Sequence, residues 1–320
     1  MSLLALENLT VRFNTPDGVV RAVNGLSLEL APGATLGIVG ESGSGKSQTA
    51  LAVMGLLAGN AEVSGSVRYD GQELLGLPAG KMNALRGAEI GMIFQDPMTC
   101  LNPYLRIGPQ MAEVLVQHRG LAWAAALDAS AQMLDAVRVP DARARLRQYP
   151  HELSGGQRQR VMIAMTLLCH PKLLIADEPT TALDVTIQAQ ILDLLAGLRR
   201  EMGLAILLIT HDLGVVAELC DEALVMYAGQ TMEQGPTRQL LGRATHPYTR
   251  GLLRSRPSAG LAANGPLQAI PGAPPDLSRL PPGCPFQPRC RYAEPVCSER
   301  MPQLQRDGDL RRACHLRPAD

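Results

Sequence analysis

The sequence predicts an α/β protein in which helices cover a parallel sheet, followed by a loop-rich C-terminal extension. Three observations lead to this fold class. From Ser154 to about residue 240, apolar strand patterns alternate with helical ones, which is typical of a parallel sheet covered by helices. The short apolar run from Leu36 to Val39 enters a glycine-rich loop, and a helical pattern, Gln48 to Leu57, leaves that loop. After residue 255 prolines accumulate and the periodicity ends, so the tail is expected to be held by something other than a core.

The part of the chain before residue 95 predicts strands around this loop, and the part after it predicts helices. Strands are expected at residues 26–30, 36–39, 65–69 and 90–94, separated by turn signals such as Asp17-Gly18 and Asp70-Gly71. From about residue 98 to 150 the apolar residues follow a helical spacing, with one stripe through Met111 and Leu115 and another through Leu134. This segment is therefore expected to be a helical insertion.

The glycine-rich loop from Gly40 to Ser47 reads GESGSGKS and fits the phosphate-loop pattern G-x-x-x-x-G-K-[ST]. Its glycines let consecutive backbone N–H groups turn inward around phosphates, Lys46 supplies a cation, and Ser47 offers a hydroxyl to Mg²⁺. Lysine occurs only three times in the chain, so a lysine at the one required position is poorly explained by composition. The loop predicts a nucleoside triphosphate site, and its candidate binding residues are Ser42, Gly43, Ser44, Gly45, Lys46 and Ser47.

Candidate catalytic residues follow three other apolar strands. Asp177 and Glu178 end the strand that begins at Leu173, and ligands gather at the carboxyl ends of parallel strands. Asp177 is therefore expected to reach Mg²⁺, directly or through water, and Glu178 to polarise the attacking water. His211 ends a third strand and is expected to contact the γ-phosphate, while Gln95 is expected to contact Mg²⁺ or water and to sense the γ-phosphate.

Composition excludes several other classes of protein. The net charge is zero and aromatic residues make up only 3% of the chain, so a nucleic-acid-binding surface is not expected. The longest apolar stretch, Ala50 to Gly59, is far shorter than the roughly 20 residues that span a bilayer. The N-terminus has no signal-peptide pattern, because Glu7 and Arg12 interrupt it. Any association with a membrane is therefore expected to come through a partner.

A second glycine-rich segment, Leu153-Ser154-Gly155-Gly156-Gln157, completes a recognisable order of motifs. The phosphate loop, Gln95, LSGGQ, the acidic strand, Ala182-Leu183-Asp184 and His211 together resemble the nucleotide-binding subunit of ATP-binding-cassette (ABC) transporters over residues 1–240. The resemblance implies an ABC-type phosphate-loop domain with a RecA-like core, an antiparallel β subdomain and a helical subdomain at about residues 96–153. It also implies ATP hydrolysis at a site shared head to tail between two cassettes.

The same resemblance assigns further binding residues. Ser154, Gly155, Gly156 and Gln157 would belong to the nucleotide site, with the first three capping the γ-phosphate bound to the partner cassette, since hydroxyl and N–H groups at a helix start suit an anion. Asp184 would lie where the two cassettes meet. Phe13 would stack on adenine, although an aromatic residue on an alternating strand is more often part of a core. The chain carries one set of motifs, so a second polypeptide must complete the sites.

Longer stretches resemble the ATPase subunits of bacterial dipeptide and oligopeptide importers, in particular the D type. These stretches are residues 94–103, 161–165, 186–190 and 246–250. Two departures are Cys100, where serine is usual, and Gln157, where the D type often has methionine. The resemblance implies a peripheral subunit at the cytoplasmic face of the bacterial inner membrane. Its expected partners are an F-type ATPase in a heterodimer, two transmembrane permeases and an extracytoplasmic binding protein. An importer for nickel or another solute, or a soluble ABC ATPase, is the alternative.

Four of the seven cysteines, Cys284, Cys290, Cys297 and Cys314, lie in the last forty residues among several prolines. In a chain expected to be cytosolic, such a group favours a metal over disulfides. The tail of D-type subunits is similar, and that resemblance implies a [4Fe–4S] cluster on these four thiolates, whereas chemistry alone allows zinc or no metal. Residues 241–320 are accordingly expected to form a C-terminal extension built around this cysteine cluster.

Overall fold

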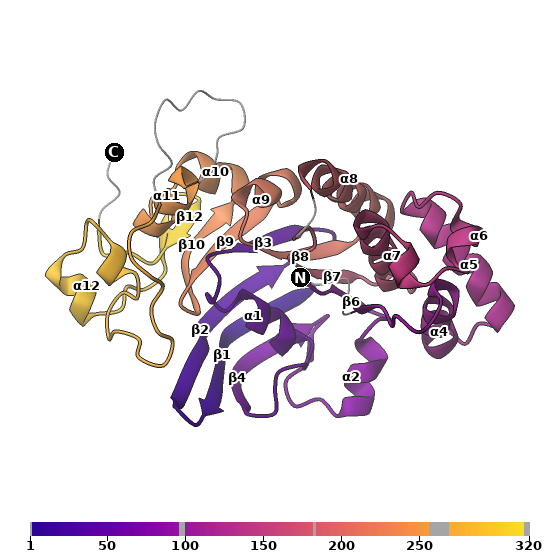
Figure 1. Cartoon of the computed structure of the whole chain (residues 1–320). Coiled ribbons are helices and arrows are strands. Elements are labelled where there is room, and N and C mark those ends of the chain that lie inside the picture. The colour runs from indigo at the N-terminus through magenta and orange to yellow at the C-terminus, as the bar shows by residue number, and fades with distance from the viewer. Residues whose placement is uncertain (1, 96–99, 182–183, 256–268, 317–320) are drawn as a thin grey trace. The chain divides into compact units, whose positions relative to one another are not determined.

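The computed structural model describes residues 2–95, 100–181, 184–255 and 269–316, and it divides the chain into two compact units (Figure 1). One unit contains residues 31–34 and 76–208. The other contains residues 2–30, 35–75 and the chain from residue 209 onward. Among the described helices, none is both long and apolar enough to cross a membrane.

An antiparallel sheet in the second unit has the strand order β2-β1-β4-β5. Its strands are β1 (Leu4–Thr15), β2 (Gly18–Leu30), β4 (Ala61–Tyr69) and β5 (Gln72–Glu73). Strand β1 buries Leu4 and Leu6, then Leu9 and Val11, so the buried side chains alternate but skip one residue between Leu6 and Leu9. The pairing register shifts at this point, where Asn8 has a φ of +51°, as an irregularity of the bulge kind requires.

The same unit contains strands with the order β11-β12-β10-β9-β3. Their bounds are β3 (Thr35–Val39), β9 (Glu222–Tyr227), β10 (Gln230–Pro236), β11 (Gln305–Asp307) and β12 (Leu310–Arg312). Strand β3 pairs in parallel with β9, and all of its residues are buried. The helices are α1 (Lys46–Val53), α9 (Leu213–Leu219), α10 (Thr237–Gly242), α11 (Pro247–Arg254) and α12 (Pro295–Glu299), with one 3-10 turn, η2 (Gln287–Arg289).

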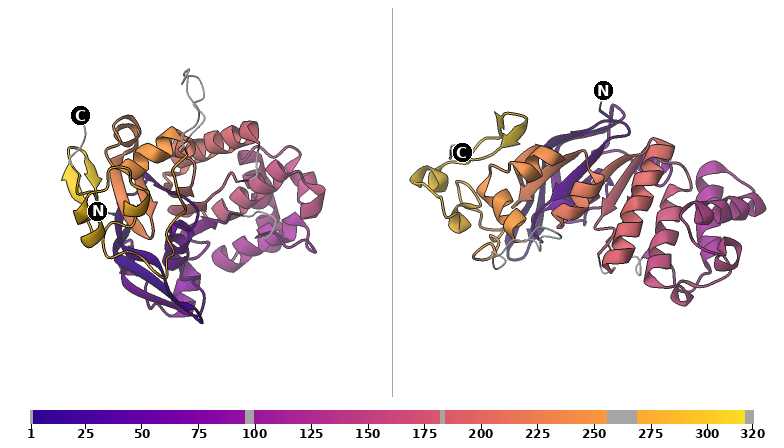
Figure 2. Two further views of the ribbon diagram at one scale, coloured as in Figure 1. Left: turned by 60° about the vertical axis from the view of Figure 1, so that its left-hand side comes forward. Right: turned by 90° about the horizontal axis from the view of Figure 1, so that it is seen from above.

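The C-terminal extension is anchored by strand pairing and by an aromatic cluster. Strand β12 pairs antiparallel with β10 and with the edge strand β11, and Figure 2 shows the yellow C-terminal segment beside the orange part of the chain. Phe286 packs edge-on against Tyr227, with ring centroids 5.4 Å apart, and it lies 5.2 Å from Tyr248. All three rings are almost completely buried. The sequence predicted a tail without a core of its own, but these contacts give the extension an apolar anchor.

The first unit contains strands in the order β8-β7-β6 and most of the helices. Their bounds are β6 (Ile90–Ile93), β7 (Leu173–Asp177), β8 (Ala205–Thr210), α2 (Ala79–Leu85), α4 (Ile107–Arg119), α5 (Trp123–Ala136), α6 (Ala142–Arg145), η1 (Pro150–Glu152), α7 (Gly155–Leu167) and α8 (Val185–Met202). Helices α4, α5 and α7 pack on one another, and Met111, Leu115 and Leu134 are buried between them. Helices α4 and α5 thus lie within the segment where the sequence predicts helices, and its apolar stripes are buried.

The helix that leaves the glycine-rich loop differs from its predicted bounds. It was expected at Gln48–Leu57, whereas α1 begins at Lys46 and its last helical residue is Val53. The helix starts earlier because Gly45, at φ +100°, supplies the left-handed conformation that ends the loop. It stops earlier because Gly55 is also left-handed, at φ +61°.

Candidate functional site

The glycine-rich loop joins β3 to α1, and two of its glycines are required by close approach to backbone. A Cβ atom on Gly40 would lie 2.2 Å from the carbonyl oxygen of Met226, and one on Gly45 would lie 2.2 Å from that of Ala22. Gly45 also has a φ of +100°, which side chains rarely adopt. The loop is therefore pressed against its own unit, and its course depends on the absence of side chains at these positions.

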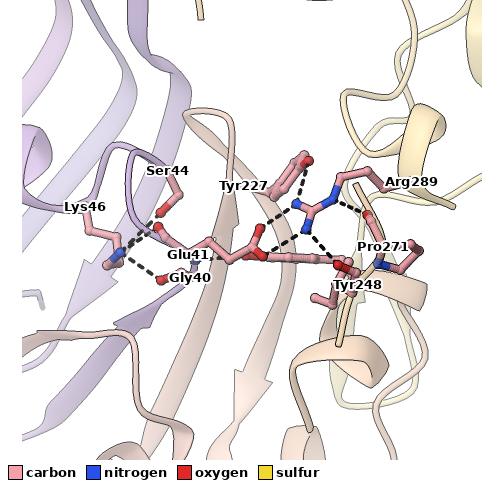
Figure 3. Close-up of polar contacts among 9 residues, drawn as sticks. Gly40, Glu41, Ser44, Lys46, Tyr227, Tyr248, Pro271 and Arg289 are labelled. Carbon is pink, nitrogen blue, oxygen red and sulfur yellow. Dashed lines mark hydrogen bonds and ion pairs between the residues drawn. The ribbon is translucent and has the colours of Figure 1, made fainter. Parts of the chain in front are cut away.

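Lys46 is almost completely buried, and its ammonium group lies within this loop. Its Nζ donates to the carbonyl oxygens of Gly40, at 2.8 Å, and Glu41, at 2.9 Å, and to Ser44 Oγ at 3.4 Å (Figure 3). A buried cation surrounded by a turn of backbone, at the start of a helix, is the arrangement that binds the phosphates of a nucleotide. Of the predicted residues, Ser42 to Gly45 thus belong to the turn around the lysine, and Lys46 and Ser47 begin helix α1.

Sequence reasoning assigned no role to Tyr248 and Arg289, which contact Glu41 of the loop, or to Tyr227, which contacts Arg289. The backbone N–H of Glu41 donates to Tyr248 Oη at 2.9 Å, and its carboxylate pairs with Arg289, whose guanidinium also donates to Tyr227 Oη at 3.2 Å. Tyr248 belongs to one of the stretches that carry the importer resemblance, and Arg289 directly precedes Cys290, so both lay close to segments already singled out. Nothing in their local pattern pointed to the loop.

Phe13 and His211 lie in the same unit as the loop. Phe13 is half-buried near the end of β1, where it pairs with Val20 on one side and Ala61 on the other. His211 is exposed directly after β8, and the following Asp212 caps helix α9 by accepting from the N–H of Gly214. Stacking of Phe13 on adenine and contact of His211 with a phosphate both remain predictions.

Gln95 and Glu178 meet at the carboxyl ends of neighbouring parallel strands in the other unit. Strands β6 and β7 pair in parallel, and Gln95 Nε2 donates to Glu178 Oε2 at 3.2 Å. Thr181 donates its hydroxyl to the same oxygen at 2.8 Å. Glu178 has a φ of +47°, an uncommon conformation for this residue type that often marks a functional position. Asp177, the last residue of β7, is only 6% exposed.

The segment Ser154–Gln157 forms the start of helix α7 as a capping box. The Gln157 N–H donates to Ser154 Oγ at 3.3 Å, and the Ser154 N–H donates to Gln157 Oε1 at 3.0 Å. Gly155 is exposed, with no atom within 4 Å of a Cβ built on it, while a Cβ on Gly156 would lie 3.1 Å from Ile187. Gln157 thus contributes its side chain to the helix start.

Asp184 caps the next helix in the same unit. Its Oδ1 accepts from the N–H of Ile187 at 2.9 Å, and the residue is exposed. The two residues before it in the quoted motif, Ala182 and Leu183, lie outside the described residues. That Asp184 lies where two cassettes meet remains a prediction.

The expected metal cluster in the extension is contradicted. Cys284, Cys290, Cys297 and Cys314 line one cavity. Among the described residues, no group of three or more His, Cys, Asp or Glu side chains is arranged to hold a metal ion. Burial raises the pKa of Cys284 to about 11, and it also raises the pKa of Cys290 and Cys314.

The assignment of a [4Fe–4S] cluster to these four cysteines is therefore wrong, and neither zinc on them nor a cysteine-cluster extension is supported by the described residues. The prediction failed because close spacing in sequence, together with prolines, was interpreted as a need for a metal to hold the tail. The aromatic cluster around Phe286, the pairing of β12 with β10 and the ion pair of Arg289 meet that need instead.

Two family models match the chain. Residues 23–181 match the ABC transporter model, and residues 232–297 match the model described as the oligopeptide/dipeptide transporter C-terminal region. Glu41 thus belongs to the first matched region, and Tyr248 and Arg289 belong to the second.

Curated relatives and solved structures agree with these matches. The chain is 57% identical to the oligopeptide transport ATP-binding protein OppD of Salmonella typhimurium over 98% of this chain and 93% of the relative. It is 58% identical to the protein of the same name from Escherichia coli, with the same coverage, and 60% identical to that from Haemophilus influenzae, over 92% and 91% of the two chains. None of these names mentions an iron–sulfur cluster.

A dimeric bacterial ABC transporter cassette has a similar structure, with a TM-score of 0.66 and 26% identity over 73% of this chain and 99% of the other. The same values hold for a dimeric ATP-binding cassette in a post-hydrolysis state bound to ADP and phosphate. The α/β fold predicted from the sequence is therefore confirmed as that of an ABC ATPase. With this architecture, a phosphate loop closed around Lys46 and relatives of 57% identity or more over nearly the whole chain, the protein belongs to the ABC transporter family of ATP-binding subunits.

Proposed function

We propose that this chain is the ATP-hydrolysing subunit that powers a bacterial ABC importer for oligopeptides. The observation that carries the proposal is its identity of 57% to 60% with three oligopeptide transport ATP-binding proteins. The match of its C-terminal part to the oligopeptide/dipeptide transporter model supports the same substrate class. As in such systems, the subunit works peripherally at the cytoplasmic face of the membrane, together with two permeases and an extracytoplasmic binding protein.

The phosphate loop binds ATP in this proposal. Backbone N–H groups from Ser42 to Gly45 surround the phosphates, and Lys46 neutralises their charge. The close approaches of Gly40 and Gly45 to backbone support this role, because they hold the loop in a shape that side chains would disrupt. Phe13 stacks on the adenine.

Hydrolysis uses groups at the ends of β6, β7 and β8. Glu178 orients and polarises the attacking water, while Gln95 and Thr181 hold its carboxylate through hydrogen bonds of 3.2 and 2.8 Å. The oxygen donors of Ser47 and Asp177 are the kind that Mg²⁺ prefers. When bound, the ion would neutralise phosphate charge. His211 contacts the γ-phosphate and positions it for attack.

Each complete site is shared with a second ATPase of the F type in a head-to-tail heterodimer. The exposed start of α7, with Ser154, Gly155, Gly156 and Gln157, covers the γ-phosphate held by the partner, and Asp184 lies where the two subunits meet. The exposure of Gly155 supports this role. The similar fold of dimeric ABC cassettes supports the arrangement as well.

Reconstitution of the complete importer tests the proposal. The chain is co-expressed with its two neighbouring permease genes and the second ATPase gene, purified as one complex and placed in liposomes with the binding protein. ATP-dependent uptake of labelled oligopeptides is the expected result. Recovery of the chain with ribosomes or DNA instead, or uptake of nickel without uptake of peptide, would contradict it.

A further inference from the structure

Glu41, the second residue of the phosphate loop, is held at three points by residues that follow it by about 200 positions or more. Arg289 donates to its carboxylate through both terminal nitrogens, at 2.6 Å to Oε2 and 3.0 Å to Oε1. Tyr248 Oη accepts from its backbone N–H at 2.9 Å (Figure 3). Both the side chain and the main chain of this loop residue are thus fixed by the C-terminal region.

Arg289 is itself immobilised. Its side chain is only 5% exposed, its Nε donates to the carbonyl oxygen of Pro271 at 2.9 Å, and its guanidinium lies over the ring of Tyr227. The hydrogen bonds to Glu41 raise the pKa of Arg289, so the group stays charged. Phe286, three residues before Arg289, packs against Tyr227 and Tyr248. A planar guanidinium held this way can orient a carboxylate, which a mobile surface arginine cannot.

Glu41 connects this arrangement to the phosphate-binding lysine. Its backbone oxygen accepts from Lys46 Nζ at 2.9 Å, beside the bond from the same nitrogen to Gly40. A rotation of the Glu41 peptide would therefore move both an N–H of the loop and a carbonyl that positions the lysine. The extension also flanks the loop elsewhere, since Pro274 and Pro275 line a cavity of about 110 Å³ together with loop residues.

We propose that Arg289 and Tyr248 are positioning residues for ATP binding, through which the C-terminal extension sets the conformation of the phosphate loop at Glu41. The inference rests on the proposed function, because it takes the loop to be the ATP site. It goes further in making the ATP affinity of the cassette depend on the extension.

Equilibrium binding of Mg–ATP to the full-length chain tests the inference. Arg289→Gln removes the charge and the paired hydrogen bonds at similar size, and Kd is expected to rise on the order of tenfold. Arg289→Lys keeps the charge without the planar pair of donors and is expected to fall between wild type and Arg289→Gln. Arg291→Gln is the matched control: this nearby arginine is exposed, lies over Tyr292 rather than against the loop, and is expected to leave Kd unchanged.

A double-mutant cycle separates positioning from simple anchoring. If the two groups act as one unit, Glu41→Gln combined with Arg289→Gln raises Kd no more than the larger single effect. If the increases in Kd of the two single variants multiply in the double variant, the proposal is overturned. So would an Arg289→Gln protein whose melting temperature falls while its Kd stays within about twofold of wild type, since the ion pair would then only anchor the tail.

Two further variants keep the outcome decisive. Should Arg289→Gln fail to fold, Tyr248→Phe removes only the hydroxyl that accepts from Glu41, and it must still weaken Mg–ATP binding for the proposal to stand. Lys46→Ala tests the ATP site itself. Wild-type affinity in Lys46→Ala overturns both proposals, whereas loss of binding there with normal binding in Arg289→Gln and Tyr248→Phe overturns the positioning role alone.

Discussion

The two glycine-rich segments of this protein differ in what their glycines contact. In the phosphate loop, Gly40 and Gly45 lie so close to backbone of their own unit that a Cβ atom would come within 2.2 Å of a carbonyl oxygen. At the start of α7, Gly155 has no atom within 4 Å of such a Cβ. The fold of the chain therefore explains the loop glycines but not Gly155.

The open surroundings of Gly155 leave room for a group from outside the chain. Ser154 and Gln157 form a capping box, so backbone N–H groups at the start of α7 already have hydrogen-bond partners within the chain. No atom lies within 4 Å of a Cβ atom built on Gly155. This agrees with the proposal that the segment covers a nucleotide held by a second subunit. Under that proposal, the loop glycines shape the chain itself and Gly155 serves the assembly.

The largest expected effect comes from Glu178→Gln. This variant should trap the assembled complex with ATP bound between the phosphate loop of one subunit and the Ser154–Gln157 segment of the other. Loss of the carboxylate is expected to lower ATP turnover of the complete importer by about a thousandfold, because general-base assistance is lost, while bound ATP is retained. Hydrogen exchange should then slow at Ser154–Gln157 relative to the ATP-free complex. Unchanged turnover would refute the role of Glu178, and unchanged exchange would refute coverage of the segment.

Gly45→Ala should damage the chain by itself. The left-handed φ of +100° and the close carbonyl of Ala22 predict a loss of about 1–3 kcal/mol in the free energy of unfolding, together with loss of ATP binding. Chemical denaturation and calorimetric titration of the isolated subunit measure both. A variant with normal stability and normal ATP affinity would show that the loop does not require glycine at position 45.

Gly155→Ala should leave the isolated chain intact and harm the assembly. Open space around the position predicts unchanged stability and unchanged ATP binding by the subunit alone. The methyl group should nevertheless crowd a nucleotide held by the partner, and ATPase activity of the complete importer is expected to fall on the order of tenfold. Full activity in the assembled importer would remove the main reason to place this segment at a shared site.

Ser154→Ala should give the smallest effect. Its hydroxyl caps α7, so its removal is expected to cost about 1 kcal/mol of unfolding free energy in the isolated chain. Ser154→Thr, which keeps the hydroxyl, is the control. A stability loss in Ser154→Ala that is absent from Ser154→Thr would confirm the cap. Equal melting temperatures for wild type and Ser154→Ala would count against it.

Much of the fold followed from local pattern. The apolar run at Leu36 predicted β3, the run ending at Asp177 predicted β7, and the stripe through Met111 and Leu115 predicted helix α4. The helix after the loop was placed two residues late, because Lys46 and Ser47 were assigned to the loop, although they already have helical conformation. Helix ends depend on single left-handed residues, and spacing of apolar residues does not reveal them.

The tail shows the opposite case. Four cysteines among prolines suggested a metal, yet among the described residues no group of three or more His, Cys, Asp or Glu side chains is arranged to hold one. What holds the extension is Phe286 against two tyrosines and Arg289 against Glu41, and none of these residues has a distinctive local pattern. Composition predicted a loop-rich extension but not the contacts that hold it in place.

The phosphate loop can be predicted without a structure, because eight consecutive residues carry the turn, the cation and the helix start, and short-range geometry follows from their order. The sequence also placed Gln95 and Glu178 at strand ends, where they meet. Only the tertiary structure decided that Glu41 is held by an arginine 248 residues away. Folding brings such pairs together through the packing of whole elements, and no local spacing in the sequence records which buried charges will meet.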